Sequence, residues 1–188
     1  MPEGNRSETA LVAQWRDGLA ILNLRGQPDD RAFLQAAQAA LGAHLPTEPC
    51  RTSQAGALRI VWAGPDDWFV IGSGGHAESL AARLRGAMAG LHAAVTDVGS
   101  GYRVLRLMGP PVREMLAQGC PLDLHPRAFG MDACAGTHFF KASVWLWEAG
   151  DAPGFELLVR RSFAGYVGLM LERATMESGL AVAVQHGM

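Results

Sequence analysis

Cysteine is scarce in this sequence of 188 residues, which contains only Cys50, Cys120 and Cys134. Three thiols are too few, and odd in number, for the disulfide framework of a small secreted domain. The first eight residues are polar and place no apolar stretch behind a basic start, so they do not resemble a secretory leader. We therefore expect free thiols, a reducing compartment and a cytoplasmic location.

Long runs of one charge and long apolar runs are missing as well. The chain has 16 Lys and Arg against 18 Asp and Glu, and no basic run is longer than the pair Arg160 and Arg161. Because binding to nucleic acid depends on clustered cations, this pattern excludes a strong attraction for nucleic acid. No segment approaches the ~20 apolar residues that a bilayer span needs, so we expect no membrane association.

Catalytic signatures are also missing: the sequence has no G-x-S-x-G elbow, no H-E-x-x-H helix and no phosphate-binding loop. Two carboxylate pairs, Asp29 with Asp30 and Asp66 with Asp67, have the chemistry for acid–base work. Both stand at a helix start or a turn, where Asp is favoured for local hydrogen bonds. We predict no catalytic, cofactor-binding or metal-binding residues on this chain.

What the sequence does contain is enough apolar material for a core, because 49% of its residues are hydrophobic and only 18% are charged. After an approach segment of residues 1–18, residues 19–98 follow the order strand, helix, strand, strand, helix, strand. Asp29 and Asp30 favour the start of the first helix, and Gly42 favours its end. The expected strands are 19–24, 58–63, 68–71 and 93–98, the expected helices lie within 29–42 and 80–91, and 45–56 is an expected loop.

Residues 99–188 repeat this order. The segment 107–111, Leu-Met-Gly-Pro-Pro, echoes 24–28, Leu-Arg-Gly-Gln-Pro, at an offset of 83 residues. Ser162 is the expected cap of a last helix that Gly179 ends. The expected strands are 102–108, 134–140, 142–147 and 155–159. The sequence thus predicts an α+β fold of two ferredoxin-like βαββαβ units with antiparallel sheets, halves 19–98 and 99–188, packed as one globular unit.

One segment fits a dinucleotide fingerprint: residues 72–77, Gly-Ser-Gly-Gly-His-Ala, follow an expected strand, open a helix and precede Asp97. The strand before them is expected to be half of a hairpin, so the parallel sheet that builds a dinucleotide crevice is missing. The matching turn at Arg160, Arg161 and Ser162 also lacks glycines. We therefore interpret the segment as a turn from strand to helix.

Two cysteines and two histidines invite a zinc interpretation, because thiolate and imidazole are ligands that zinc prefers. Their spacing argues against it. Cys134 and His138 on one strand would lie ~13 Å apart at ~3.3 Å per residue. Cys120 and His125 lie beside prolines in a stiff loop. We interpret all four as structural thiols and loop histidines.

The segment 119–129, Gly-Cys-Pro-Leu-Asp-Leu-His-Pro-Arg-Ala-Phe, closely resembles the signature segment of sarcosine oxidase gamma subunits. Most of the chain takes part in this resemblance, which extends to 64–68, 96–100, Arg103, 109–110 and 156–163.

The resemblance implies a folate-binding fold like that of the glycine-cleavage T-protein. It also implies a heterotetramer with alpha, beta and delta subunits. That complex would oxidatively demethylate sarcosine to glycine, pass the one-carbon unit to tetrahydrofolate and form hydrogen peroxide. FAD, FMN, NAD and the folate site would belong to the other subunits. This chain would be non-catalytic and would pack mainly against alpha.

One T-protein element carries over by residue. Gly154, Phe155 and Glu156 resemble a Gly-Phe-Glu whose carboxylate grips the pterin ring through its N–H donors. The companion tyrosine is missing, because Ala149 stands in its place. This departure argues against folate binding by the chain.

Two other functions compete with a scaffolding subunit. One is a free-standing, aminomethyltransferase-like folate protein, which would need roughly twice this length. The other is a folate-fold assembly factor for iron–sulfur proteins, whose Lys-Gly-Cys-Tyr-Thr-Gly-Gln motif is not found, since Gln118, Gly119 and Cys120 continue as Pro121 and Leu122.

Overall fold

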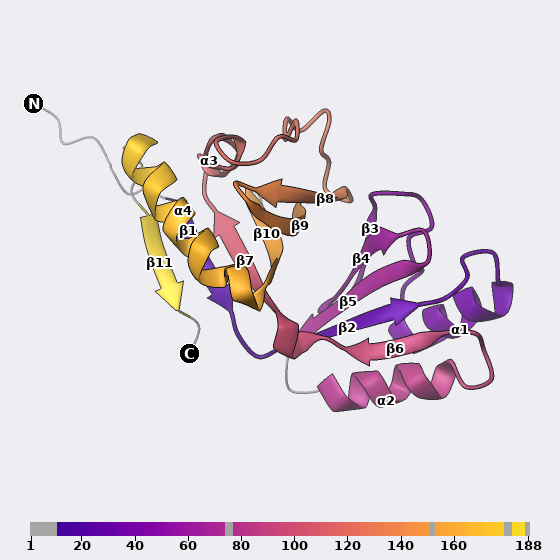
Figure 1. Cartoon of the computed structure of the whole chain (residues 1–188). Coiled ribbons are helices and arrows are strands. Elements are labelled where there is room, and N and C mark those ends of the chain that lie inside the picture. The colour runs from indigo at the N-terminus through magenta and orange to yellow at the C-terminus, as the bar shows by residue number, and fades with distance from the viewer. Residues whose placement is uncertain (1–10, 74–76, 151–152, 179–181, 187–188) are drawn as a thin grey trace, which may run out of the picture. The chain divides into compact units, whose positions relative to one another are not determined.

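The computed structural model describes residues 11–73, 77–150, 153–178 and 182–186. The chain divides into two compact units (Figure 1). The central unit comprises Asp17–Tyr102 and Asp132–Ala135, and the terminal unit comprises the chain up to Arg16, Arg103–Met131 and the chain from Gly136 on. The domain boundaries predicted at 18/19 and 98/99, and the packing of the halves into one body, stay predictions.

The central unit contains a five-stranded sheet in the order β3-β4-β5-β2-β6, in which every neighbouring pair is antiparallel. Without β3, its elements have the predicted order βαββαβ. The elements are β2 (Leu19–Arg25), α1 (Arg31–Leu41), β3 (Thr52–Ala55), β4 (Leu58–Gly64), β5 (Asp67–Ser73), α2 (Ala77–Ala87), β6 (Ala94–Asp97) and the 3-10 turn η1 (Gly99–Gly101).

Strand β3 corrects the expected loop over 45–56. Its sequence, Thr-Ser-Gln-Ala, has no apolar alternation and so gave no strand signal. It forms because a tight turn returns the chain into β4, where Ala55 pairs with Leu58. Gly56 supplies the positive φ of +55° in this turn.

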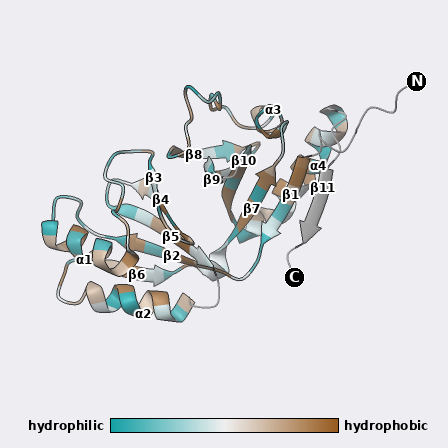
Figure 2. Cartoon of the chain, turned by 180° about the vertical axis from the view of Figure 1, so that it is seen from behind, coloured by the Kyte–Doolittle hydropathy of each residue, from teal (hydrophilic) through white to brown (hydrophobic). Residues whose placement is uncertain are grey.

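Helix α1 begins and ends as its sequence predicts. The Asp30 carboxylate accepts a 2.8 Å hydrogen bond from the Ala32 N–H, and Gly42 closes the helix in the left-handed region at φ +75°. Phe33, Ala37 and Leu41 are buried on one face of the helix. They join the core of the central unit, which apolar residues of the strands complete (Figure 2).

The terminal unit is built on a six-stranded sheet in the order β11-β1-β7-β10-β9-β8. From β7 on, the order strand, helix, strand, strand, helix, strand repeats once β8 is set aside, and its last strand, β11, adds to the strands expected from the sequence. The elements are β1 (Leu11–Arg16), β7 (Tyr102–Met108), α3 (Val112–Ala117), β8 (Cys134–Phe139), β9 (Ala142–Glu148), β10 (Gly154–Arg160), the 3-10 turn η2 (Arg161–Phe163), α4 (Ala164–Ser178) and β11 (Val182–His186).

Strand β1 inserts between β7 and β11, pairing antiparallel with the first and parallel with the second. The two expected ferredoxin-like units are therefore confirmed, with one parallel pair added to the second. The expected cap Ser162 lies inside η2 rather than directly before α4, because the chain first makes a 3-10 turn. The expected helix end at Gly179 lies outside the described residues. Among the helices that the structure describes, none has the length and apolar character of a membrane span.

Candidate functional site

Glu156 is the residue with the strongest sequence argument for binding a ligand, and its carboxylate lies inside the terminal unit. It sits on β10 directly opposite Trp147 of β9, and its side chain is only 7% exposed. Arg16 Nη1 donates to Oε1 at 2.6 Å, and Trp147 Nε1 donates to Oε2 at 3.0 Å. Each carboxylate oxygen is therefore held by a donor of the same chain.

Three strands bring this network together. β1 carries Arg16, which pairs with Val104 of β7, while β9 and β10 carry Trp147 and Glu156. Trp147 is fully buried, so its indole N–H needs an internal acceptor. Hydrogen bonds to an ionised carboxylate are the strong kind, and a pterin would have to displace them.

The turn between β9 and β10 lacks the expected tyrosine. Ala149 stands at this position, and its backbone N–H donates to the carbonyl of Gly154 at 3.0 Å. A methyl group has no donor or ring to offer a pterin. Of the two side chains that the T-protein resemblance requires, this chain keeps the carboxylate only.

The signature segment 119–129 is anchored by one arginine. Arg113, on α3, donates to the carbonyl of Leu124 and to the carboxylate of Glu148. Its guanidinium carbon also lies 4.8 Å from the centre of the Phe155 ring. One side chain thus fixes the loop to β9 and β10, beside a cleft of about 230 Å³ that Arg113 and Glu148 help to line.

Close packing explains the start of the same segment. A Cβ added to Gly119 would lie 2.6 Å from the Phe140 ring, and the Phe140 N–H donates to the Gly119 carbonyl at 2.7 Å. At the other end, the rings of Phe129 and Phe155 lie 6.0 Å apart. The segment therefore shows a structural role in the contacts that the structure describes.

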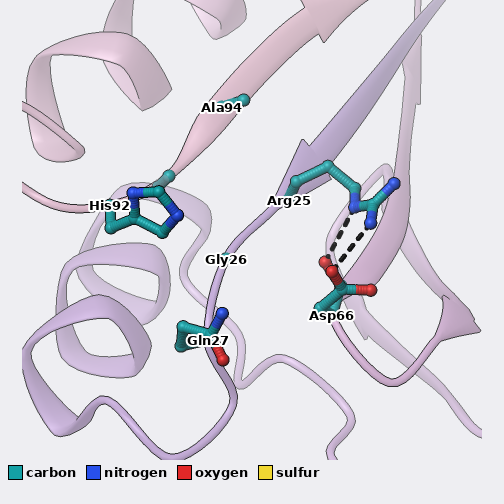
Figure 3. A pocket seen from close by; sticks show the side chains of 7 residues that line it. Arg25, Gly26, Gln27, Asp66, His92 and Ala94 are labelled. Atoms are coloured by element: carbon teal, nitrogen blue, oxygen red, sulfur yellow. Dashed lines mark hydrogen bonds and ion pairs between the residues drawn. The ribbon is translucent and has the colours of Figure 1, made fainter.

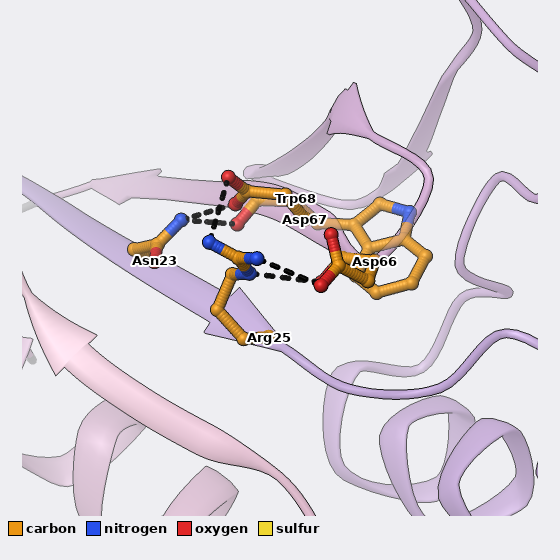
Figure 4. A network of polar contacts seen from close by, with 5 residues as sticks. All are labelled: Asn23, Arg25, Asp66, Asp67 and Trp68. Carbon is orange, nitrogen blue, oxygen red and sulfur yellow. Dashed lines mark hydrogen bonds and ion pairs between the residues drawn. The ribbon is translucent and has the colours of Figure 1, made fainter.

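The central unit has its own polar network, on exposed strand ends (Figure 4). Arg25 donates to the carboxylate of Asp66 at 2.7 Å and lies 3.6 Å from that of Asp67, which also accepts from Asn23. The hydrogen bond to Arg25 lowers the pKa of Asp66, and the same bond raises the pKa of Arg25. The carboxylate pair thus joins the turn between β4 and β5 to β2 through Arg25 and Asn23, which lie more than 40 residues away in sequence.

Arg25 and Asp66 also line a cleft of about 270 Å³, together with Gly26, Gln27 and His92 (Figure 3). Their mutual hydrogen bond occupies the guanidinium and the carboxylate that a ligand in this cleft would otherwise contact. Gly26 is required here because a Cβ would lie 2.3 Å from the Phe33 ring.

Three of the four residues for which a zinc interpretation was considered, Cys120, His125 and Cys134, have other partners. The thiol of Cys134 donates to the carbonyl of Arg51 at 3.2 Å, and that of Cys120 lies 3.8 Å from the Thr137 hydroxyl. The His125 ring accepts from the Arg127 N–H within its own loop. Over the described residues, no group of three or more His, Cys, Asp or Glu side chains could hold a metal ion.

The dinucleotide fingerprint falls partly outside the described residues, at 74–76. The strand before it, β5, is antiparallel to both of its neighbours, β4 and β2. The Asp97 carboxylate accepts from the Gly99 N–H at 2.8 Å, as in a local turn. The antiparallel prediction is confirmed, and the parallel strand that the fingerprint needs is missing at this position.

Comparison with known proteins identifies the family of this chain. The model of the sarcosine oxidase gamma subunit family matches residues 25–177. The chain belongs to this family. A sarcosine oxidase subunit gamma of Corynebacterium sp. (strain P-1) is 32% identical over 164 residues, 87% of this chain and 78% of the relative. One from Arthrobacter sp. is 35% identical over 123 residues, 65% of this chain, and the match spans about 60% of that relative's length.

Solved structures agree with this placement. A heterotetrameric sarcosine oxidase from Corynebacterium sp. U-96 has a chain that is 28% identical, with a TM-score of 0.85 over 93% of this chain and 88% of that one. Aminomethyltransferase T of the Bartonella henselae glycine cleavage system matches 95% of this chain and 48% of its own, with a TM-score of 0.68 and 17% identity. This second likeness shows a shared fold alone.

Sequence reasoning missed the partners of Glu156. Arg16 lay in a segment without an assigned element, although Ala13, Gln14, Trp15 and Arg16 alternate between apolar and polar residues in the pattern of a half-buried strand. That alternation was the available signal for β1. No local pattern pairs Trp147 with Glu156, because their register depends on the turn between β9 and β10.

Proposed function

We propose that this chain is the gamma subunit of a heterotetrameric sarcosine oxidase and that it is non-catalytic by itself. The complex oxidatively demethylates sarcosine to glycine, transfers the one-carbon unit to tetrahydrofolate and forms hydrogen peroxide. Its alpha, beta and delta subunits carry FAD, FMN, NAD and the folate site, and this chain packs mainly against alpha. The complex works in the cytoplasm.

The family match over residues 25–177 carries this proposal. The similar structure from Corynebacterium sp. U-96 is that of a heterotetrameric sarcosine oxidase, which supports the assembly. The internal binding of Glu156 by Arg16 and Trp147 supports the non-catalytic role, because the carboxylate that resembles a pterin ligand already has two donors.

Affinity purification of the tagged full chain from its native cell tests the assembly. We expect a yellow complex with flavin absorbance and three further subunits, and this complex should consume oxygen when sarcosine is added. A colourless chain recovered without partners would contradict the proposal.

We further propose that Glu156 is a structural residue rather than a folate ligand. Calorimetric titration of the purified chain with tetrahydrofolate should give no measurable heat of binding. Binding at micromolar concentration would overturn this assignment and would favour a folate protein that acts on its own.

A further inference from the structure

Two cysteines of the central unit lie opposite each other where two distant segments meet. Arg51 and Ala133 form an antiparallel bridge. On its two sides, the Thr52 N–H donates to the Asp132 carbonyl at 2.7 Å, and the Cys134 N–H donates to the Cys50 carbonyl at 2.9 Å. This register makes Cys50 and Cys134 a directly opposed pair.

The hydrogen bond from the Cys134 N–H to the Cys50 carbonyl, at 2.9 Å, holds the two backbones next to each other. Cys50 and Cys134 share one of the two N–H···O bonds of a hydrogen-bonded antiparallel pair, whose Cα atoms lie about 5.5 Å apart in a regular ladder. Disulfides span Cα separations of roughly 4.4–6.8 Å. The backbones of Cys50 and Cys134 are therefore close enough for a disulfide, whose formation requires rotation of the two side chains.

The environments of the two thiols differ. Cys50 is exposed and has a φ of 61°, a left-handed conformation that is uncommon for a residue other than glycine. Cys134 is 1% exposed, and its thiol donates to the carbonyls of Arg51 at 3.2 Å and Trp62 at 3.5 Å. Peroxide in solution can therefore reach the first thiol, and the second is held beside it.

We propose that Cys50 and Cys134 form a peroxide-oxidisable dithiol that closes to an intrachain disulfide. The oxidant, hydrogen peroxide, follows from the proposed function, on which this inference rests. The Cys50 thiolate attacks one peroxide oxygen and the O–O bond breaks, which yields a sulfenic acid and, after protonation, water. The Cys134 sulfur then displaces the hydroxyl group, losing its proton as the second water leaves. Two thiols and one peroxide thus give one disulfide and two waters.

Protonation of Cys134 makes the second step slow at neutral pH. Burial, followed by the nearby charge of Cys50, raises the pKa of the Cys134 thiol to about 12, while the Arg51 guanidinium acts in the opposite direction. Arg51 is itself paired with Glu48 at 3.5 Å and Asp132 at 3.2 Å. The thiolate fraction of Cys134, and with it the rate of closure, should rise about tenfold per pH unit between pH 7 and 9.

The test uses the purified complex, treated with hydrogen peroxide, quenched with an alkylating agent and digested without reduction. We expect a linked peptide pair containing Cys50 and Cys134, with the loss of two hydrogen atoms. In Cys134→Ser, Cys50 should stop at the sulfenic acid, which dimedone traps. Cys50→Ser should lose the linkage while its fold stays intact, because the replaced side chain is exposed. Cys120→Ser should behave like the unchanged chain.

A second arm replaces added peroxide with sarcosine and air, so that the complex supplies its own oxidant. Linkage with added peroxide but not with sarcosine would contradict the proposed source of peroxide and would still support the oxidisable cysteine pair. Over-oxidation of Cys50 without linkage, or a link to Cys120, would overturn the pair itself. The linked chain should also unfold roughly 10 °C higher than the reduced chain, because the bond closes a long loop.

Discussion

The central and terminal units both hold an arginine against a carboxylate, but at very different depths. In the central unit, Arg25 and Asp66 meet at 2.7 Å with side chains 48% and 45% exposed. In the terminal unit, Arg16 and Glu156 meet at 2.6 Å with side chains 33% and 7% exposed. Similar distances therefore have different consequences. Water screens the first pair, whereas the second would leave a buried charge without a partner if it were broken.

Loss of Arg16 should show the largest effect. Arg16→Met keeps most of the side-chain volume but removes the donor to Oε1 of the buried Glu156 carboxylate and leaves the Trp147 indole N–H on Oε2. We expect the free energy of unfolding to fall by about 3 kcal/mol, measured by urea denaturation of the full chain. Adding Glu156→Gln should recover much of this loss, because the amide carries no charge. Equal losses of unfolding free energy in Arg16→Met and Arg25→Met would contradict the difference that we expect between the buried and the exposed ion pair.

The two buried tryptophans allow a matched test of the hydrogen bond to Glu156. Trp68 and Trp147 are both fully buried, and the Trp68 indole N–H donates to the Pro46 carbonyl at 2.8 Å. Trp68→Phe and Trp147→Phe each remove one N–H and a similar volume. We expect Trp147→Phe to cost about 1 kcal/mol more, because its acceptor is charged. Denaturant titration of both variants measures the difference, and a larger loss in Trp68→Phe would contradict it.

Changes at Arg25 and Asp66 should have the smallest effect. At neutral pH, Arg25→Met should unfold at a denaturant concentration close to that of the unchanged chain, since both partners face water. The lowered pKa of Asp66 stabilises the folded state above the ordinary Asp pKa, and this contribution is lost as the pH falls through the lowered value. Asp66→Asn should therefore flatten the acid limb of the stability curve below about pH 4.

The sequence predicted the fold where local rules and apolar patterns agree. Helix α1 has a capping Asp30, a buried face and Gly42 at its end, so each signal names the same element. Strand β3 and the start of α4 were missed because β3 depends on pairing with β4, and because a 3-10 turn separates Ser162 from the helix. Neither feature produces a periodic pattern of apolar residues in its own segment.

The candidate site was less predictable than the fold. The resemblance to a pterin-binding segment identified Glu156, but the arginine that occupies it lies 140 residues away in sequence. The same holds for Cys50 and Cys134, which only the pairing of Arg51 with Ala133 brings together. Contacts of this kind follow from sheet register, which a single sequence does not specify.

The most direct test of the proposed scaffolding role is turnover by the chain alone. The purified full chain, without partners, should release no one-carbon unit from sarcosine or from an aminomethylated carrier in the presence of tetrahydrofolate, and should show no flavin absorbance. Activity should appear only when the other three subunits are added. Turnover of any one-carbon substrate by the isolated chain would contradict the account.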